Sequence, residues 1–292
     1  MLDSSLRMST LPEPYSRYLR VLGIDGVPSG LEGLRTIVRQ HLFRAPFENI
    51  SKLLLFGREG AGRFVTIPEF LDRIEHQDLG GTCHSNNPFL AELLRALGYD
   101  TDLLGADMMP RLNCHTCLRV RVDSVAYHVD VGYGGPFREP IRLDRLPHEI
   151  VEGTRRYVFD RKPDGSGFEM AVFSGQDRVH GYVVHDPPRT LDFFTPAMQN
   201  SFQPTAPFLN CVRICRFFED HSMELLDRNL SIHRATETIQ LELNTAEEWQ
   251  AAIVNHLQMP RCPSDAAIRV LERVTGKPFF GERAAQLERT GL

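Results

Sequence analysis

The spacing of apolar residues changes at Gly98, and this change constrains the fold more than any other feature of the chain. Between residues 13 and 97, apolar positions recur at the three- and four-residue spacing of amphipathic helices. From residue 99 to about 195, they fall in short runs that are rich in β-branched and aromatic side chains and separated by turn residues. We therefore expect an α+β fold with helices first and an antiparallel sheet or barrel afterwards.

The remainder of the chain returns to a mixed pattern of strands and helices. The helices expected before Gly98 lie within residues 31–47, 67–77 and 83–97, and the strands expected after it lie at residues 117–122, 125–131, 155–160, 167–173 and 180–186. Further strands are expected at residues 207–218, 223–234 and 236–243, and helices at residues 244–257 and 264–276. Asn244 and Ser264 are the residues expected to cap these last two helices.

Length and composition indicate a packed protein with more than one subdomain. The 292 residues exceed the size at which a single hydrophobic core stops growing, and 42% of them are hydrophobic with no low-complexity tract. The formal net charge of −5 does not support a nucleic-acid partner. The N-terminus lacks the apolar core of a signal peptide, and no stretch approaches the length of a membrane span. We expect a cytoplasmic protein with free thiols and no membrane partner.

Two cysteine pairs have spacings that metal sites also use, CHTC at residues 114–117 and CVRIC at residues 211–215. The first pair runs on into a segment with the pattern of a strand, and the sequence holds no second C-x-x-C pair. We interpret both pairs as free cysteines on packed strands and expect no bound metal ion.

The segment GGTCHSNNPF places Cys83 between a glycine pair and a helix whose first residue is ambiguous. If Thr82 caps the helix, Cys83 lies in its first turn, and Pro88 then removes a hydrogen bond from the second turn. If Asn87 is the cap instead, Pro88 becomes the first helical residue, a position that suits proline. We favour an irregular helix start at Cys83.

A base for this cysteine is expected on a hairpin formed by the two strands around Asp123 and Ser124. With a two-residue loop, Val122 faces Val125, all facing residue numbers sum to 247, and Cys117 faces Asp130. Side chains alternate with period 2, so His115 shares a face with Cys117 and becomes a diagonal neighbour of Asp130. A three-residue loop would place the two residues on opposite faces.

Together these residues have the chemistry of a nucleophilic triad. A cysteine requires a nearby imidazole to form a thiolate, and the imidazole requires a third group to orient it. Cys83, His115 and Asp130 supply these roles. Each also fits a structural role, as a packed small residue, a strand-end polar residue or the start of a turn. His84, beside the cysteine, and His128, on the face of Asp130, are alternative bases.

The same segments resemble the arylamine N-acetyltransferases, whose cysteine motif reads R-G-G-x-C-x-E-x-N. LGGTCHSNN at residues 79–87 matches the two glycines, the cysteine and the asparagine of that motif. APFENI at residues 45–50 resembles the P-F-E-N segment of the family, and DVGYGG at residues 130–135 resembles its D-V-G-F-G element. Further along, Ser201, Pro204 and Phe208 fit the S-x-x-P-x-x-x-F pattern of the family.

This resemblance implies a helical domain over residues 1–98, a β-barrel domain over residues 99–200 and an α/β lid over residues 201–292. It also implies ping-pong acyl transfer, in which Cys83 takes an acetyl group from acetyl-CoA, and His115, oriented by Asp130, assists the attack of an amine. The expected partners are an acyl-CoA donor and a small amine acceptor, with acetyl-CoA as co-substrate and no permanently bound cofactor.

The resemblance also assigns substrate-binding residues. It implies that Phe47, Tyr133 and Gly134 contact the acceptor. Residues that hold the phosphates of the cofactor are not assigned, and the basic residues expected in the lid are candidates: Arg216, Arg228 and Arg234.

The sequence departs from the family pattern at four positions. Leu79 and Ser85 replace the arginine and glutamate of the cysteine motif, while Glu48 of P-F-E-N is kept. A buried carboxylate without its partner is costly, so Glu48 should be exposed, protonated or paired again. Asp107 stands where arginine is expected, and Ala206 where serine is expected.

The leading interpretation is an N-acetyltransferase for arylamines, hydrazines or N-hydroxyarylamines. Alternatives that use the same triad are an amide synthase with a longer acyl thioester and a cysteine hydrolase. A non-catalytic binding module that kept the pocket is a further alternative. The sequence leaves the natural acceptor and the oligomeric state open.

Overall fold

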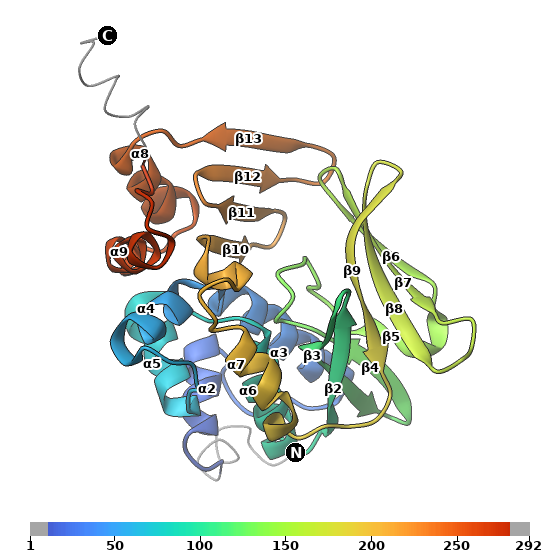
Figure 1. Ribbon diagram of the computed structural model, residues 1–292. Helices are drawn as coiled ribbons and strands as arrows, with labels where there is room; N and C mark the ends of the chain where they lie inside the picture. The colour runs from blue at the N-terminus through green and yellow to red at the C-terminus, as the bar shows by residue number, and fades with distance from the viewer. Residues whose placement is uncertain (1–10, 281–292) are drawn as a thin grey trace, which may run out of the picture.

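The computed structural model describes residues 11–280, and its first part consists of helices, as expected (Figure 1). The α-helices before the large sheet are α2 (Tyr15–Leu22), α3 (Gly30–Arg44), α4 (Ile50–Glu59), α5 (Ile67–Gln77) and α6 (Cys83–Ala96). The amphipathic segments at residues 31–47 and 67–77 become α3 and α5, whose apolar residues join one buried cluster. A capping box starts α5, since Thr66 and Glu69 each accept a backbone N–H bond from the other.

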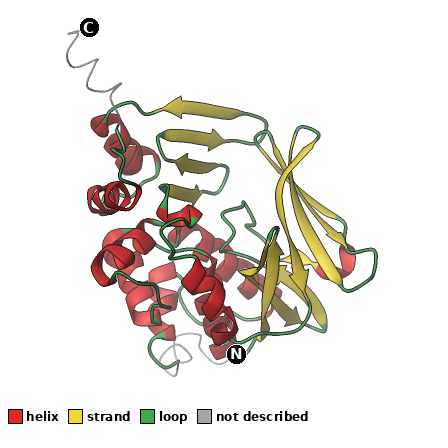
Figure 2. Cartoon of the chain, viewed as in Figure 1, coloured by secondary structure: helices red, strands yellow, loops and turns green. Residues whose placement is uncertain are grey.

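A strongly curved antiparallel sheet of eight strands follows and forms a near-closed barrel (Figures 1 and 2). Its strands are β2 (Asp100–Met108), β3 (Arg111–Val122), β4 (Val125–Val129), β5 (Ile141–Arg142), β6 (His148–Glu152), β7 (Arg155–Arg161), β8 (Gly167–Ser174) and β9 (Asp177–His185). The strand order is β5-β4-β3-β2-β9-β8-β7-β6. The expected strands of this region are all present, while the pattern analysis had not predicted β2, β5 and β6.

The C-terminal part builds a second sheet that includes a strand from the helical part. Its strands are β10 (Arg213–Phe217), β11 (Ser222–Leu226), β12 (Asn229–His233) and β13 (Thr238–Glu242). At its edge β1 (Phe47–Glu48) pairs antiparallel with β10, so Phe47 faces Cys215. Helices α8 (Ala246–Ala251) and α9 (Ser264–Thr275) cover one face of this sheet, with Trp249 and Ile253 in the shared core.

Several local expectations need correction. Thr245, not Asn244, caps α8, because its side chain and that of Glu248 complete a capping box. Ser264 is the first residue of α9 and donates a hydrogen bond to Gln250, so it is not the cap. Residues 207–209 form a 3-10 turn, and the strand begins only at Arg213.

Two further helical segments complete the described structure. Helix α7 (Thr195–Asn200) lies between the large sheet and β10. A π-helical turn over residues 252–256 continues α8 inside the predicted helix at residues 244–257. Among the described residues, no helix is both long and apolar enough to cross a membrane.

The glycine pair before Cys83 is required by a close approach of two backbone segments. Gly81 N–H donates to the Pro46 carbonyl at 3.2 Å, and Glu48 N–H donates to the Gly81 carbonyl at 3.1 Å. A Cβ atom at Gly80 would lie only 2.3 Å from the Pro46 carbonyl oxygen. This position therefore excludes a side chain, and the contact fixes the segment that leads into α6.

We expect Gly80→Ala to lower the free energy of unfolding by about 1–3 kcal/mol, because the added methyl group meets rigid backbone. Gly81→Ala is the matched control. Its Cβ would meet the Ser85 side chain at 3.0 Å rather than backbone, so the loss should be smaller. Urea denaturation of both variants measures the difference. Equal losses would show that the contact with Pro46 is not the cause.

Candidate active site

Cys83 is the first residue of α6, at the end of the helix where backbone N–H groups are free. Thr82 occupies the cap position with an extended backbone and no side-chain hydrogen bond, and Pro88 lies inside the helix. The Thr116 hydroxyl donates to the Cys83 carbonyl at 2.7 Å and ties α6 to β3. The favoured start at Cys83 is therefore correct, and Asn87 is not the cap. The partial positive charge of a helix N-terminus stabilises a thiolate at this place.

The hairpin has the predicted register. Val122 pairs with Val125 and Leu118 with Val129, in agreement with the sum of 247. Asp123 and Ser124 have φ values of 50° and 64°, so both turn residues are left-handed, as a two-residue type I′ turn requires. On the resulting face, His115 Nε2 lies 2.7 Å from Asp130 Oδ2. The structure brings Cys83, His115 and Asp130 together.

Asn87 holds the carboxylate in place, a role that the sequence analysis missed. Its Nδ2 donates to Asp130 Oδ1 at 2.9 Å and to the Thr116 carbonyl at 2.6 Å. Its Oδ1 accepts the Val131 N–H at 2.9 Å. The spacing from Cys83 contained the signal, because a residue four positions later in a helix lies on the same face. Asn87 thus joins α6, the helix that carries Cys83, to the hairpin.

The charges of the buried pair stabilise each other. Burial alone disfavours the protonated form of His115, but the charge and hydrogen bond of Asp130, together with a hydrogen bond to Cys83, raise its pKa to about 10. Burial also opposes the Asp130 carboxylate, and the His115 charge and hydrogen bond outweigh it and lower the pKa of Asp130. The histidine is therefore an imidazolium at neutral pH and places a positive charge beside the Cys83 side chain.

His128, an alternative base, lies behind the pair rather than beside the thiol. Its Nε2 shares a hydrogen bond of 2.8 Å with the Tyr182 hydroxyl, and the Tyr182 ring lies 4.9 Å from the His115 ring. Burial lowers the pKa of His128 to about 4, so it is neutral. Tyr182 fills the space between the two histidines and restricts the orientation of His115.

His84, the other alternative base, has no group to orient it. Burial, together with the charges of Lys52 and His115, lowers the pKa of His84 to about 3. Its Nε2 has no hydrogen-bond partner among residues 11–280. The ring packs against Phe64 and Phe194. Within residues 11–280, His115 is therefore the one of the three candidate bases that is paired with a carboxylate.

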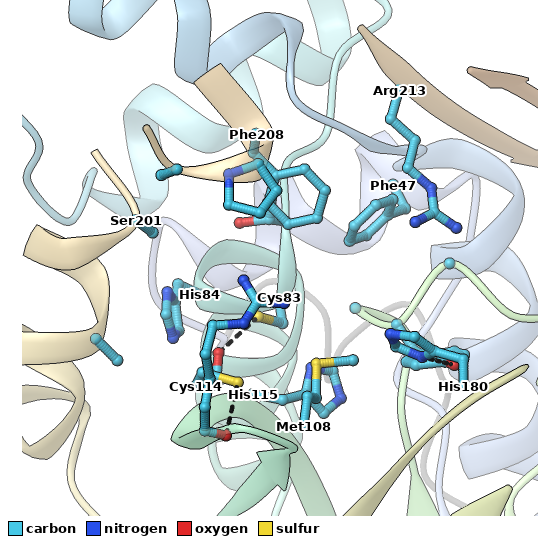
Figure 3. Close-up of a pocket in the computed structure, with 18 of the residues that line it drawn as sticks. Phe47, Cys83, His84, Met108, Cys114, His115, His180, Ser201, Phe208 and Arg213 are labelled. Carbon is cyan, nitrogen blue, oxygen red and sulfur yellow. Dashed lines mark hydrogen bonds between the residues drawn. The ribbon is translucent and has the colours of Figure 1, made fainter. Parts of the chain in front are cut away.

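The candidate triad opens into a cavity of about 670 Å³ that all parts of the fold line (Figure 3). Cys83 and His115 lie on its wall, and so do the three residues that the resemblance assigned to the acceptor: Phe47, Tyr133 and Gly134. Tyr133 stands at a ring distance of 5.9 Å from His115 and shares a 2.6 Å hydrogen bond with His180. A small aromatic molecule would find apolar walls next to the thiol.

The basic residues of the cavity are not those expected from the lid. Arg216, Arg228 and Arg234 do not line it, and Arg216 instead donates to the Leu257 carbonyl at 3.3 Å. The basic and acidic side chains on the wall are Lys52, Arg111, Arg155, Arg213 and Glu224. The wall is therefore positive although the whole chain has a net charge of −5, which suits an anionic co-substrate.

The departures from the family pattern are accommodated by packing. Leu79 is fully buried in the core of the second sheet, where a charge would have no water. Glu48 is also fully buried, accepts the Ser51 N–H at 2.8 Å, and has a pKa raised by burial, with Arg73 partly opposing this rise. Of the three alternatives for Glu48, exposure is excluded, and the raised pKa favours protonation.

The two remaining departures have different surroundings. Asp107 pairs with His185 at 2.8 Å and accepts the Asn113 N–H at 2.6 Å, while Ala206 lines the cavity. Among the described residues, neither cysteine pair belongs to a cluster of three potential metal ligands. Within residues 11–280, the side chains close enough to share a metal ion are Asp72, Glu75 and His76 on α5. Arg17 already neutralises the two carboxylates of that group.

Comparison with known proteins identifies the class to which this fold and site belong. The family model described as N-acetyltransferase matches residues 30–260. The chain belongs to the arylamine N-acetyltransferase family and is an acyltransferase of that family.

Its similarity to individual relatives is moderate. It is 29% identical to an arylamine N-acetyltransferase of Mycolicibacterium smegmatis over 252 residues, 82% of this chain and 89% of the relative. It is 25% identical to an N-malonyltransferase of Fusarium pseudograminearum, with 77% of each chain covered. The solved structure of the M. smegmatis arylamine N-acetyltransferase superposes with a TM-score of 0.72 at 26% identity and covers 87% of this chain and 96% of that one.

The His115–Asp130 pair predicts the titration of the imidazole. We expect His115 to remain protonated at pH 8 and to lose its proton as the pH rises through about 10. In Asp130→Asn the favourable charge is gone while burial remains, so the pKa should fall to near or below the ordinary value of 6.5. NMR of nitrogen-15-labelled histidine measures both titrations. A wild-type pKa near 6.5 would contradict the ion pair.

Proposed function

We propose that this protein is an N-acetyltransferase that moves an acetyl group from acetyl-CoA to the nitrogen of arylamines, hydrazines or N-hydroxyarylamines. The observation that carries the proposal is the 2.7 Å contact of His115 Nε2 with Asp130 Oδ2, with Cys83 on the same cavity wall. The family uses acyl-CoA as co-substrate. Acetyl is the acyl group named for the M. smegmatis relative, which this chain covers over 89% of its length.

The first half-reaction charges the enzyme. The Cys83 thiolate attacks the thioester carbonyl carbon, a new carbon–sulfur bond forms, and the bond to the CoA sulfur breaks. The His115 imidazolium supplies a proton to the departing CoA thiolate. Backbone N–H groups at the start of α6 are the proposed donors to the oxyanion, because α6 begins at Cys83.

The second half-reaction transfers the acetyl group to nitrogen. An amine held against Phe47, Tyr133 and Gly134 attacks the acetyl-cysteine carbonyl, and neutral His115 accepts the amine proton. Asp130 stabilises the imidazolium that forms, and Asn87 keeps the carboxylate oriented. Collapse of the intermediate releases the amide and restores the thiolate–imidazolium pair.

Intact mass spectrometry after mixing with acetyl-CoA tests this proposal. We expect one acetyl adduct on the wild-type protein and none on Cys83→Ser, because a hydroxyl in this site lacks a thiolate's nucleophilicity. Cys114→Ser is the matched control, since Cys114 lines the same cavity but has no carboxylate-oriented histidine assigned to it, and its adduct should persist. An arylamine should discharge the adduct and yield the acetylated amine.

Other outcomes separate the alternatives. An adduct that water clears as fast as the amine would identify a hydrolase. No adduct with Cys83 still readily alkylated would exclude acetyl-CoA as the donor and favour another acyl thioester. No adduct with an inert thiol would refute catalysis by Cys83.

A further inference from the structure

Lys52 on α4 is a buried cation on the wall of the acyl-transfer cavity. Its residue exposure is only 7%, and it lines the same cavity as Cys83. Its Nζ donates to Ser201 Oγ at 2.5 Å and lies 4.1 Å from the centre of the Phe202 ring. An ammonium group has three donors, so its position beside the cavity leaves it able to bind a further acceptor.

Lys52 has no carboxylate partner among residues 11–280, in contrast to two partly exposed arginines of the cavity. Arg155 and Arg213 both pair with Glu224, each at 2.7 Å. Burial lowers the pKa of Lys52 to about 8, and the charge of Cys83 acts against this decrease. A largely protonated and unpaired ammonium is costly inside a protein, and an anionic ligand would remove that cost.

Lys52 lies away from Phe47, one of the residues proposed to bind the acceptor. Figure 3 shows Ser201, the partner of Lys52, on one side of Cys83, and Phe47 with Arg213 on the other. His84, whose Nε2 is buried and unpartnered, lines the Ser201 side together with Thr82. The Ser201 side of the cavity thus offers hydroxyl, imidazole and ammonium groups near the thiol, whereas the Phe47 side combines an aromatic ring with the Arg213 guanidinium.

We propose that Lys52 is a specificity residue that binds the free carboxylate of a carboxyacyl thioester, such as malonyl-CoA, and so adds a second class of donor. This inference rests on the proposed acyl transfer through Cys83. In the charging step the Cys83 sulfur forms a bond to the thioester carbon and the bond to the CoA sulfur breaks, with the proton of His115 going to CoA. The distal carboxylate is unchanged and pairs with the Lys52 ammonium throughout.

Two other sources of anionic groups would use Lys52 differently. A contact with the phosphates of CoA would affect acetyl-CoA and malonyl-CoA alike, because both carry the same phosphates. A contact with an acceptor carboxylate would affect only the discharge of the acyl-enzyme. A contact with the acyl carboxylate changes the ratio of the two acylation rates, which is the quantity to be measured.

Rapid-quench mass spectrometry of Cys83 acylation, without any acceptor, gives the rates for malonyl-CoA and acetyl-CoA. We expect the malonyl-to-acetyl rate ratio to fall about tenfold or more in Lys52→Met, the scale of one charge-assisted hydrogen bond. Lys52→Arg should retain most of the ratio because it keeps the cation. Lys277→Met, an exposed lysine beyond α9, is the matched control and should match wild type. Thermal unfolding verifies that each variant folds.

The remaining outcomes overturn the inference or its basis. An equal ratio in wild type and Lys52→Met overturns the carboxylate contact. If both rates fall in parallel, the ratio is also unchanged, and Lys52 then acts on the CoA phosphates or on the Cys83 sulfur instead. If Lys52→Met slows discharge of the acyl-enzyme by 4-aminobenzoate but not by 4-methylaniline, Lys52 contacts the acceptor carboxylate. This result also overturns the inference. If neither thioester acylates wild-type Cys83, the proposed function itself has failed.

Discussion

The buried hydrogen bond between His115 and Asp130 is the interaction on which the site depends. Two charged groups are removed from water there, and each would be unfavourable without the other. Their pairing leaves an imidazolium next to the first turn of α6, so the histidine and the helix N-terminus both act on the Cys83 sulfur. Asn87 makes the arrangement rigid because it bonds to Asp130 from the same helix that carries Cys83.

The cavity exists because three parts of the chain meet around this pair. Strand β1, only two residues long, pairs with β10 and brings Phe47 to the wall, while Gly80 permits the approach of the segment that leads to α6. A Cβ atom at Gly132 would lie 2.6 Å from Cys83 Cα, so this glycine allows the end of the hairpin to contact the start of α6. Small residues at these contacts therefore matter as much as the reactive side chains.

The electrostatics of the cavity differ from those of the whole chain. The chain has a net charge of −5, yet four basic residues and one acidic residue line the cavity. Within this wall, Arg155 and Arg213 share Glu224, whereas Lys52 depends on a hydroxyl and an aromatic ring. The positive charges on this wall consequently favour anionic molecules over neutral ones.

Much of the fold and the candidate triad could be predicted from local sequence signals. Periodicity located α3, α5 and the strands β3, β4, β7, β8 and β9, but it missed the nine-residue strand β2. The register of the β3–β4 hairpin followed from side-chain alternation across a two-residue turn. The short strands β1 and β5 carry too few residues to show a period, and the caps of α8 and α9 were each misplaced by one residue. The positioning roles of Asn87 and Tyr182 were also missed, because their partners are distant in the chain.

By itself, the sequence determined the order of helices and strands, the alternation that sets His115 beside Asp130, and the motifs of the family. Only the tertiary structure decided which histidine faces the thiol, that Glu48 is buried, and that Lys52 has no carboxylate partner within residues 11–280. The physical reason is the range of the interactions. Periodicity and turn chemistry act between near neighbours, whereas burial and charge pairing depend on segments that meet only when the chain has folded.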